Sequence, residues 1–416
     1  MRDNMMSVTI SYLEQKQESQ KREQAIKEAL KGETYLDSSS DGVKTERKSW
    51  LSNFHPYLTE EVKNDNNVDE TESRRKSSII NTITPGMRFN LRDKQKTFTT
   101  DLSLTRVVFN NRGGSNRTYA DARSALNYSL GKGMLTIADS YNNYFDPETR
   151  LIGSQVRSNQ DNPDSDQIGT LRNWKNTFVA GYGRMFNRLG FDTAYQRTDY
   201  DDSEDGDYYE DKVSISPYLN LSKKTRLISE YYYKRKIYPR TENPQHSIYN
   251  SISLGATSAL TPKTTALIKG RYEKASRRNA ADYEDYILNG SIGYKINQRS
   301  DISLAYEYDN HDSVSDAEVY KRHVLDLSGN NRMAFNPKFR LFYGLSLHYK
   351  DYPKFTDSAG FPDSRIDKTY KTKLGCAYNF SSWLDFSLTW THSKFDSNKQ
   401  ENYTKDVIAF KTEAKF

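Results

Sequence analysis

The feature that most constrains the fold of this chain is a period of two that recurs from about residue 55 to the last residue. In the segment 300–309, the apolar side chains of Ile302 and Leu304 alternate with the polar side chains of Asp301 and Ser303. Successive side chains of an extended strand point to opposite faces, so this alternation predicts a strand with one apolar and one polar face. Eighteen segments follow this pattern. Their predicted starts lie near residues 55, 78, 97, 118, 133, 172, 188, 209, 225, 247, 264, 284, 301, 319, 338, 367, 384 and 404.

The connections between these segments fall into two classes that alternate along the chain. Short turns such as Gly131-Lys132 and Asn187-Arg188 alternate with longer polar stretches such as 145–170 and 351–364. Short turns on one rim, long loops on the other and an even number of strands are typical of a transmembrane β-barrel. A sheet can span lipid only when it closes and leaves no unpaired edge. We therefore predict an all-β fold: a transmembrane antiparallel up-and-down β-barrel of about 18 strands over residues 55–416.

The composition agrees with a membrane barrel. Only 35% of the residues are hydrophobic and 28% are charged, which in a water-soluble chain would favour disorder. The 31 tyrosines and 18 phenylalanines contradict disorder, because a solvated tail has no use for so many aromatic side chains. In a barrel only the outward half of each strand meets hydrocarbon. The residues predicted to face the membrane are Ile302, Leu304, Leu341, Leu345, Phe386, Leu388, Trp390, Ile408, Phe410 and Phe416.

The polar faces are predicted to line a lumen that carries more cations than anions. Over the eighth to eighteenth segments, about sixteen Lys and Arg side chains and about eight Asp and Glu side chains fall at the alternating positions that form the polar faces. A wall with this bias concentrates anions by its field. The alternative is a set of cross-strand ion pairs that only solvate the interior. The basic residues predicted to line a possible substrate path are Lys212, Arg226, Lys234, Lys269, Arg271, Arg332, Arg340, Lys371, Lys373, Lys411 and Lys415.

The last segment, 404–416, fits the closing strand of such a barrel. It directs Ile408, Phe410 and Phe416 to one face and Lys411 and Lys415 to the other. A terminal aromatic residue resembles the C-terminal signal by which bacterial outer-membrane barrels are recognised for insertion. We therefore expect the barrel-assembly machinery to be a partner of this strand.

The first part of the chain has a different pattern. Residues 9–31 are rich in helix formers and are followed by Gly32, which predicts a short polar helix, and a linker follows from Ser38. We assign 1–54 to a periplasmic N-terminal extension. The N-terminus lacks the apolar region of a secretory signal, so we expect an exported protein to have lost its signal before this sequence begins.

Catalytic, metal and nucleic-acid sites find little support in the sequence. The single cysteine, Cys376, excludes a disulfide within the chain and a cysteine-ligated cofactor. The six histidines fall on separate segments with no i, i+4 pair. The loop at 200–212 resembles half of a calcium loop, but Lys212 stands where a bidentate glutamate is required. The net charge of +6 is spread along the chain. We expect no enzyme activity, no cofactor, no metal and no nucleic-acid partner.

Three stretches carry a resemblance to a known family. They read FHPYLTEEVKNDNN, SSIINTITPGMRFNL and YEDYILNGSIGYKINQRSDISLAYEYDNHD. They are similar to the β-barrel porins found beside bacterial exopolysaccharide synthesis and export systems. The resemblance covers roughly residues 54–416, and Thr84-Pro85-Gly86 is its most particular element. It implies an outer-membrane conduit or scaffold and carries over no catalytic residues.

A soluble or fibrous β protein on the cell surface remains an alternative and would need no detergent for extraction. The three favoured functions place the protein in the bacterial outer membrane in contact with lipid and lipopolysaccharide. The first is a channel or export conduit for anionic or saccharide material, associated with exopolysaccharide. The second is a structural sheath or anchor around a periplasmic export protein or a protein that fills the lumen. The third is a general porin.

Overall fold

The computed structural model describes residues 53–68, 70, 76–110, 116–143, 173–202, 208–239, 246–278, 282–311, 319–353, 363–400 and 402–416. All of them belong to one compact unit of the chain. The predicted N-terminal helix and its linker lie outside the described residues, as do residues 203–207 of the 200–212 loop. No helix among the described residues is long and apolar enough to span a membrane.

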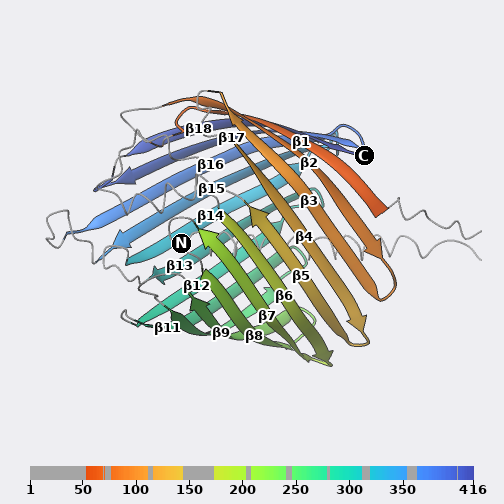
Figure 1. Cartoon of the computed structure of the whole chain (residues 1–416), viewed down its shortest axis with the longest axis vertical. Coiled ribbons are helices and arrows are strands. Elements are labelled where there is room, and N and C mark those ends of the chain that lie inside the picture. The colour runs from red at the N-terminus through yellow and green to blue at the C-terminus, as the bar shows by residue number, and fades with distance from the viewer. Residues whose placement is uncertain are drawn as a thin grey trace, which may run out of the picture. The chain divides into compact units, whose positions relative to one another are not determined.

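The described part of the chain forms eighteen antiparallel strands (Figure 1). No predicted start differs from the observed one by more than two residues, the largest difference being at β16. The strands are β1 (Phe54–Asp65), β2 (Ser78–Arg92), β3 (Lys96–Phe109), β4 (Arg117–Leu130), β5 (Gly133–Asn143), β6 (Asn173–Phe186), β7 (Leu189–Asp202), β8 (Tyr208–Asn220), β9 (Thr225–Ile237), β10 (Ser247–Ala259), β11 (Thr264–Arg277), β12 (Tyr283–Lys295), β13 (Ser300–His311), β14 (Tyr320–Arg332), β15 (Phe339–Tyr352), β16 (Arg365–Asn379), β17 (Leu384–Ser397) and β18 (Tyr403–Lys415).

The sheet closes on itself. Each strand pairs with its neighbours in sequence, and β1 also pairs with β18, from Tyr57 with Lys415 to Asp65 with Val407. The N–H of Phe416 extends this seam by donating to the carbonyl of Pro56, at 2.8 Å. The predicted closed antiparallel barrel of 18 strands is therefore confirmed.

The Thr84-Pro85-Gly86 element interrupts one ladder without shifting its register. Ile83 pairs with Arg106 and Gly86 with Ser103, while Thr84 and Pro85 make no pair with β3, in keeping with the missing N–H of proline. A Cβ at Gly86 would collide with the ring of Tyr57 from β1. Glycine is therefore needed here so that this tyrosine can lie flat against the neighbouring strand.

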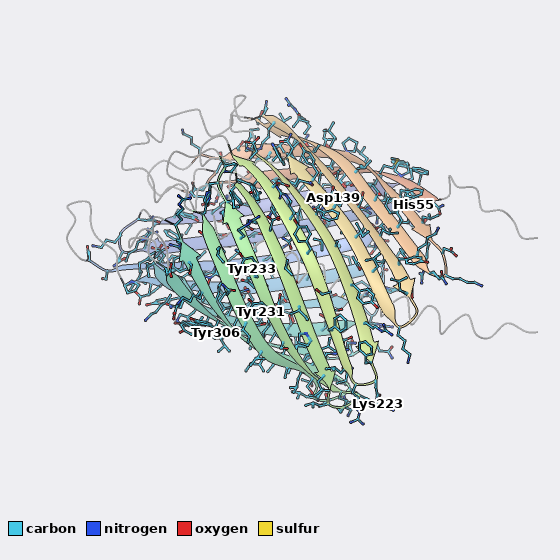
Figure 2. All side chains as sticks on the ribbon, turned by 60° about the horizontal axis from the view of Figure 1, so that its bottom comes forward. His55, Asp139, Lys223, Tyr231, Tyr233 and Tyr306 are labelled. Atoms are coloured by element: carbon cyan, nitrogen blue, oxygen red, sulfur yellow. The ribbon has the colours of Figure 1, made fainter. Side chains whose placement is uncertain are left out.

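The outer surface of the barrel is rich in exposed apolar and aromatic side chains. Near the short turns, Phe54 contacts Phe89 and Phe89 contacts Phe98, with ring centroids 4.7 and 6.0 Å apart. Farther toward the long loops, Tyr231 and Tyr306 are among the exposed aromatic side chains labelled in Figure 2. Aromatic belts at both interfaces are typical of outer-membrane barrels.

The closing strand gives a direct test of which face meets lipid. Phe410 is 46% exposed and pairs with Val62 and Leu388, whereas its neighbour Lys411 lies on the opposite face. We predict that Phe410→Arg makes insertion into vesicles less favourable by about 2 to 4 kcal/mol, because a cation near the middle of a lipid-facing surface costs that much. Lys411→Ala is the control and should leave folding intact. Damage by Lys411→Ala with a neutral Phe410→Arg would show that the two faces are assigned the wrong way round.

Candidate functional site on the inner wall

The inner wall of the barrel is the candidate site, and the strand register defines it. Residues that pair across antiparallel strands lie on the same face of the sheet. Val213 and Tyr233 pair with each other and are both exposed, so their face is the outer one. Lys212 pairs with Lys234 one residue away and therefore lies on the inner face.

The same criterion places the other predicted site residues. The basic residues lie on the inner face but are spread over seven strands, so they form no single pocket. Of the ten apolar residues, nine lie on the outer face and Phe416 follows the end of β18. The inner-face residues are Lys212, Arg226, Lys234, Lys269, Arg271, Arg332, Arg340, Lys371, Lys373, Lys411 and Lys415.

One group on this wall leaves positive charge in excess. The carboxylate of Glu230 is 2.9 Å from the Nζ of Lys269 and 3.8 Å from the Nζ of Lys212. Arg271 follows two residues after Lys269 on the same face and pairs with Ser253 of β10. Since one carboxylate is shared by two ammonium groups, Lys212, Glu230 and Lys269 together keep one positive charge.

In two other groups on this wall, carboxylates balance or outnumber the cations. Arg322 of β14 lies 2.6 Å from a carboxylate oxygen of Glu307 and 3.6 Å from one of Asp309, both on β13. Close to the short turns, Arg88 contacts Asp101 at 2.9 Å and Glu413 at 3.5 Å. These contacts are the cross-strand ion pairs of the alternative interpretation, so the cationic bias is local and does not hold around the whole wall.

Two lysines of β16 lack such a partner. Lys371 pairs in the sheet with Ser346 and Ser393, and Lys373 pairs with Gly344 and Thr391. Within the described residues, no carboxylate lies within ion-pair distance of either ammonium group. The Nζ of Lys373 is 5.8 Å from the ring centroid of Phe342 on the same wall. Because their neighbours are small or neutral, these lysines can hold an anion without first breaking an ion pair.

Inward-facing tyrosines near the long loops were not among the predicted lumen residues, which are all basic. The Nζ of Lys236 lies 3.7 Å from the ring centroid of Tyr208, and that of Lys234 lies 3.8 Å from the ring centroid of Tyr249. These distances are typical of cation–π contacts. The alternation does contain this information, because Tyr208 falls on the same face as Lys212 of β8 and Tyr249 on the same face as Ser251 and Ser253 of β10.

Beyond the strands, Asp363 and Lys399 form an ion pair between two long loops. The hydrogen bond from the Lys399 ammonium group is the main reason why the pKa of the Asp363 carboxyl lies below its ordinary value. The pair is therefore intact at neutral pH and is lost when acid protonates Asp363.

The described part of the chain contains no candidate metal site. No group of three or more His, Cys, Asp or Glu side chains there is arranged to hold an ion. Asp201, which begins the calcium-like stretch, instead accepts a hydrogen bond from the indole N–H of Trp174 at 2.7 Å.

Comparison with known proteins gives a likeness in fold. No protein-family model matches the sequence, and neither does any curated protein. Among solved structures, the outer membrane protein OpdK of Pseudomonas aeruginosa matches with a TM-score of 0.52 and 9% identity, over 88% of this chain and 100% of that one. OccK5 (OpdH) of the same organism matches with a TM-score of 0.51 and 12% identity, over 88% and 99%. OccK2 (OpdF), solved in complex with glucuronate, gives 0.52 and 9%, over 88% and 99%.

These values show that the chain shares the barrel fold of those outer-membrane proteins. None of the three concerns an exopolysaccharide system, so that part of the sequence resemblance stays a prediction.

The shared carboxylate of Glu230 gives a test of the wall. We predict that Glu230→Gln raises the anion-to-cation permeability ratio by roughly twofold or more, because it removes the carboxylate that both Lys212 and Lys269 contact. The ratio is obtained from the reversal potential of the protein in a planar bilayer under a salt gradient. The matched control is Glu60→Gln, which makes the same change on an exposed outer position of β1. Equal shifts in both variants would contradict the assignment of Glu230 to the ion path.

Proposed function

We propose that the protein is an outer-membrane channel that conducts small anionic solutes, with acidic saccharides as the favoured class. The observation that carries the proposal is the pair Lys371 and Lys373, two cations two residues apart on one face of β16 and without a carboxylate partner among the described residues. Such a pair attracts a negatively charged solute, and the solute does not have to displace a carboxylate in order to bind.

The strand number supports an open path. Barrels of sixteen to eighteen strands enclose an aqueous channel, whereas barrels of eight strands are filled by their own side chains. The inner face here is lined largely by Ser, Thr, Asn and charged residues, which solvate a polar solute.

The tyrosine contacts of the wall support a saccharide as the solute. A sugar ring presents apolar C–H groups that pack on an aromatic face, and a sugar acid adds a carboxylate for a neighbouring cation. Lys234 over Tyr249 and Lys236 over Tyr208 show that both kinds of group occur on this wall, although these two lysines are themselves buried. OccK2, which shares the fold, was solved with glucuronate, a solute of this class. More specifically, we propose that the channel is a conduit associated with exopolysaccharide, as the sequence resemblance implies.

A structural sheath is the second candidate. Ser251, Ser253, Glu273 and Asp285 lie on the inner face of β10 to β12, and each is at most 5% exposed. Such burial on an inner wall favours a lumen that is filled or narrow beside these strands. A sheath of this kind would not conduct ions, and a general porin would conduct without preference for charge.

The orientation and partners follow from the proposed location. We place the long loops outside the cell, and the short turns and the extension 1–54 in the periplasm, where the extension can meet an export protein or a protein that fills the lumen. We also propose that β18 is the strand recognised by the barrel-assembly machinery and that the outer surface contacts lipopolysaccharide.

Charge reversal on β16 tests the proposed function. We predict that Lys371→Glu with Lys373→Glu changes the channel from anion-preferring to cation-preferring and slows swelling of proteoliposomes in glucuronate more than in glucose. The matched control is Lys368→Glu, an exposed residue on the outer face of the same strand, which should change neither readout. A wild-type barrel that inserts but conducts no ions would contradict the proposed channel function and favour the structural sheath. Conductance that is equal for anions and cations would identify a general porin.

A further inference from the structure

An aromatic ring stands among polar side chains on the inner wall of β14 to β17. Phe342 of β15 pairs in the sheet with Asn330 of β14 and with Gly375 of β16. A Cβ at Gly375 would collide with the Phe342 ring, so the ring extends across this glycine and rests on the barrel wall. Phe342 is half-buried, which leaves part of its ring open to the lumen. The wall therefore offers an apolar surface to a solute at this point.

Two cations flank this ring without covering it. The Cζ of Arg340 lies 6.0 Å from the Phe342 ring centroid, and the Nζ of Lys373 lies 5.8 Å from it. At Tyr208, by contrast, the Nζ of Lys236 approaches to 3.7 Å, a distance at which the ammonium group occupies the ring face. Within the described residues, no further cation and no second aromatic ring contacts Phe342. A solute can therefore pack on this ring without displacing a cation from it.

Arg340 and Lys373 lie on opposite sides of the ring along the barrel wall. Arg340 precedes Phe342 by two residues toward the short turns and pairs with Ala377 of β16. Lys373 pairs with Gly344, which follows Phe342 by two residues toward the long loops. Ala377 and Lys373 are four residues apart on β16, or about 13 Å at the usual rise of a strand. The ring thus lies between two separate cationic positions.

The positive charge around the ring is accessible and is not cancelled by ion pairs. Its four cations, all exposed, are Arg332 of β14, Arg340 of β15, and Lys371 and Lys373 of β16. Within the described residues, none of them lies within ion-pair distance of a carboxylate. Two carboxylates of the neighbouring strands are engaged elsewhere. Asp326 accepts a hydrogen bond from the hydroxyl of Ser346, and Asp301 accepts one from the amide of Asn330.

Hydroxyl groups lie beside the ring on the next strand. Thr389 of β17 pairs with Gly375, and Thr391 pairs with Lys373. Ligand sites commonly combine an aromatic surface with a few polar groups that fix orientation. A sugar acid matches all three kinds of group, because its C–H groups can pack on the ring, its hydroxyls on the threonines and its carboxylate on a cation. An aromatic acid would use the ring and the cations and leave the threonine hydroxyls without a role.

We propose that Phe342 and its flanking cations form a binding subsite for acidic oligosaccharides, in which one sugar ring packs on Phe342 and acidic groups on either side of it bind Arg340 and Lys373. The inference rests on the channel function proposed above and assigns that channel a preference for linked sugar acids over single ones. A single sugar acid would satisfy one cationic position and leave the other free. A neutral sugar would use the ring alone, and an inorganic anion would use the cations alone.

Isothermal titration calorimetry of the purified full-length barrel in detergent tests the subsite without requiring conduction. The probe is trigalacturonate, a chain of three linked sugar acids, which should bind the wild type roughly tenfold or more tightly than galacturonate or the neutral maltotriose. Phe342→Leu keeps an apolar cover over Gly375 but loses the flat ring, and should weaken trigalacturonate binding about tenfold, whereas Phe342→Trp should retain it. Arg340→Gln with Lys373→Gln should reduce the affinity for trigalacturonate to that for maltotriose.

A steric variant tests the same position without changing a charge or the ring. A Cβ at Gly344 would meet atoms of Leu327 and Lys373 at 3.8 Å, which is ordinary contact, so Gly344→Val should fold. Its side chain would fill the space between the ring and Lys373, and it should lower the affinity for trigalacturonate.

Two matched controls accompany these variants. Phe395→Leu changes an inner-wall phenylalanine whose ring already stacks on Tyr403, with centroids 5.2 Å apart. Arg123→Gln changes an inner-wall arginine that is already paired with Asp121, at 2.8 Å. Both should bind trigalacturonate like the wild type.

Three results would each overturn the subsite: undiminished binding by Phe342→Leu and by the arginine and lysine variant, equal affinity for galacturonate and trigalacturonate, or equal binding of benzene-1,4-dicarboxylate. A barrel that conducts anions but binds no trigalacturonate would leave the proposed function standing without the subsite. A barrel that conducts no ions but binds trigalacturonate through Phe342 would leave the subsite standing without the channel.

Discussion

The pairing of β1 with β18 is the constraint on which the rest of the barrel depends. Without this seam, each of the two strands would present a row of unpaired backbone N–H and C=O groups, and in hydrocarbon each such group costs several kcal/mol. The nine pairs from Tyr57–Lys415 to Asp65–Val407 remove both edges at once. Closure also fixes the register of every other strand, because a slip by one residue anywhere would turn an apolar face toward the lumen.

The strands were predictable because their signal is local. Parity is read from neighbouring residues, and alternation such as that of Ile302 and Leu304 needs no knowledge of the partner strand. Contacts between side chains on different strands were not predictable in this way. Glu230 reaches Lys269 across β10, where Gly255 pairs with Lys269 and has no side chain to separate the two charges. This contact depends on three strands at once. Assigning faces one strand at a time therefore predicts the excess of basic residues on the inner face, but it does not predict which carboxylates contact them.

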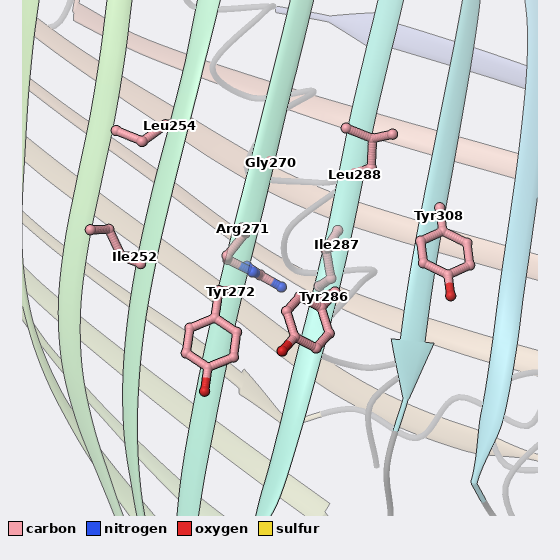
Figure 3. Close-up of a pocket in the computed structure, with 9 residues that line it drawn as sticks. All are labelled: Ile252, Leu254, Gly270, Arg271, Tyr272, Tyr286, Ile287, Leu288 and Tyr308. Carbon is pink, nitrogen blue, oxygen red and sulfur yellow. The ribbon is translucent and has the colours of Figure 1, made fainter.

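The outer face also departs from the simple alternation. Glu60 and Asp139 are exposed on it, between apolar neighbours of β1 and β5, and Asp139 is labelled in Figure 2. Parity places these carboxylates correctly, but it gives no reason for their presence. Gly270 on the outer face of β11 shows the opposite case, because its missing side chain leaves a gap between Leu254 and Leu288 (Figure 3). No periodicity in the sequence marks this gap.

The seam has one further consequence for the architecture. β1 begins and β18 ends at the same rim, where the short turns join other neighbours, and the N–H of Phe416 already bonds to the carbonyl of Pro56. The two strands therefore form a hairpin that lacks only its covalent turn. A circular permutation that joined them by a few residues and opened another short turn, such as Gly131-Lys132, would keep every ladder of the barrel. The position of the chain break is thus independent of the eighteen-strand ring, which has no first strand in any energetic sense.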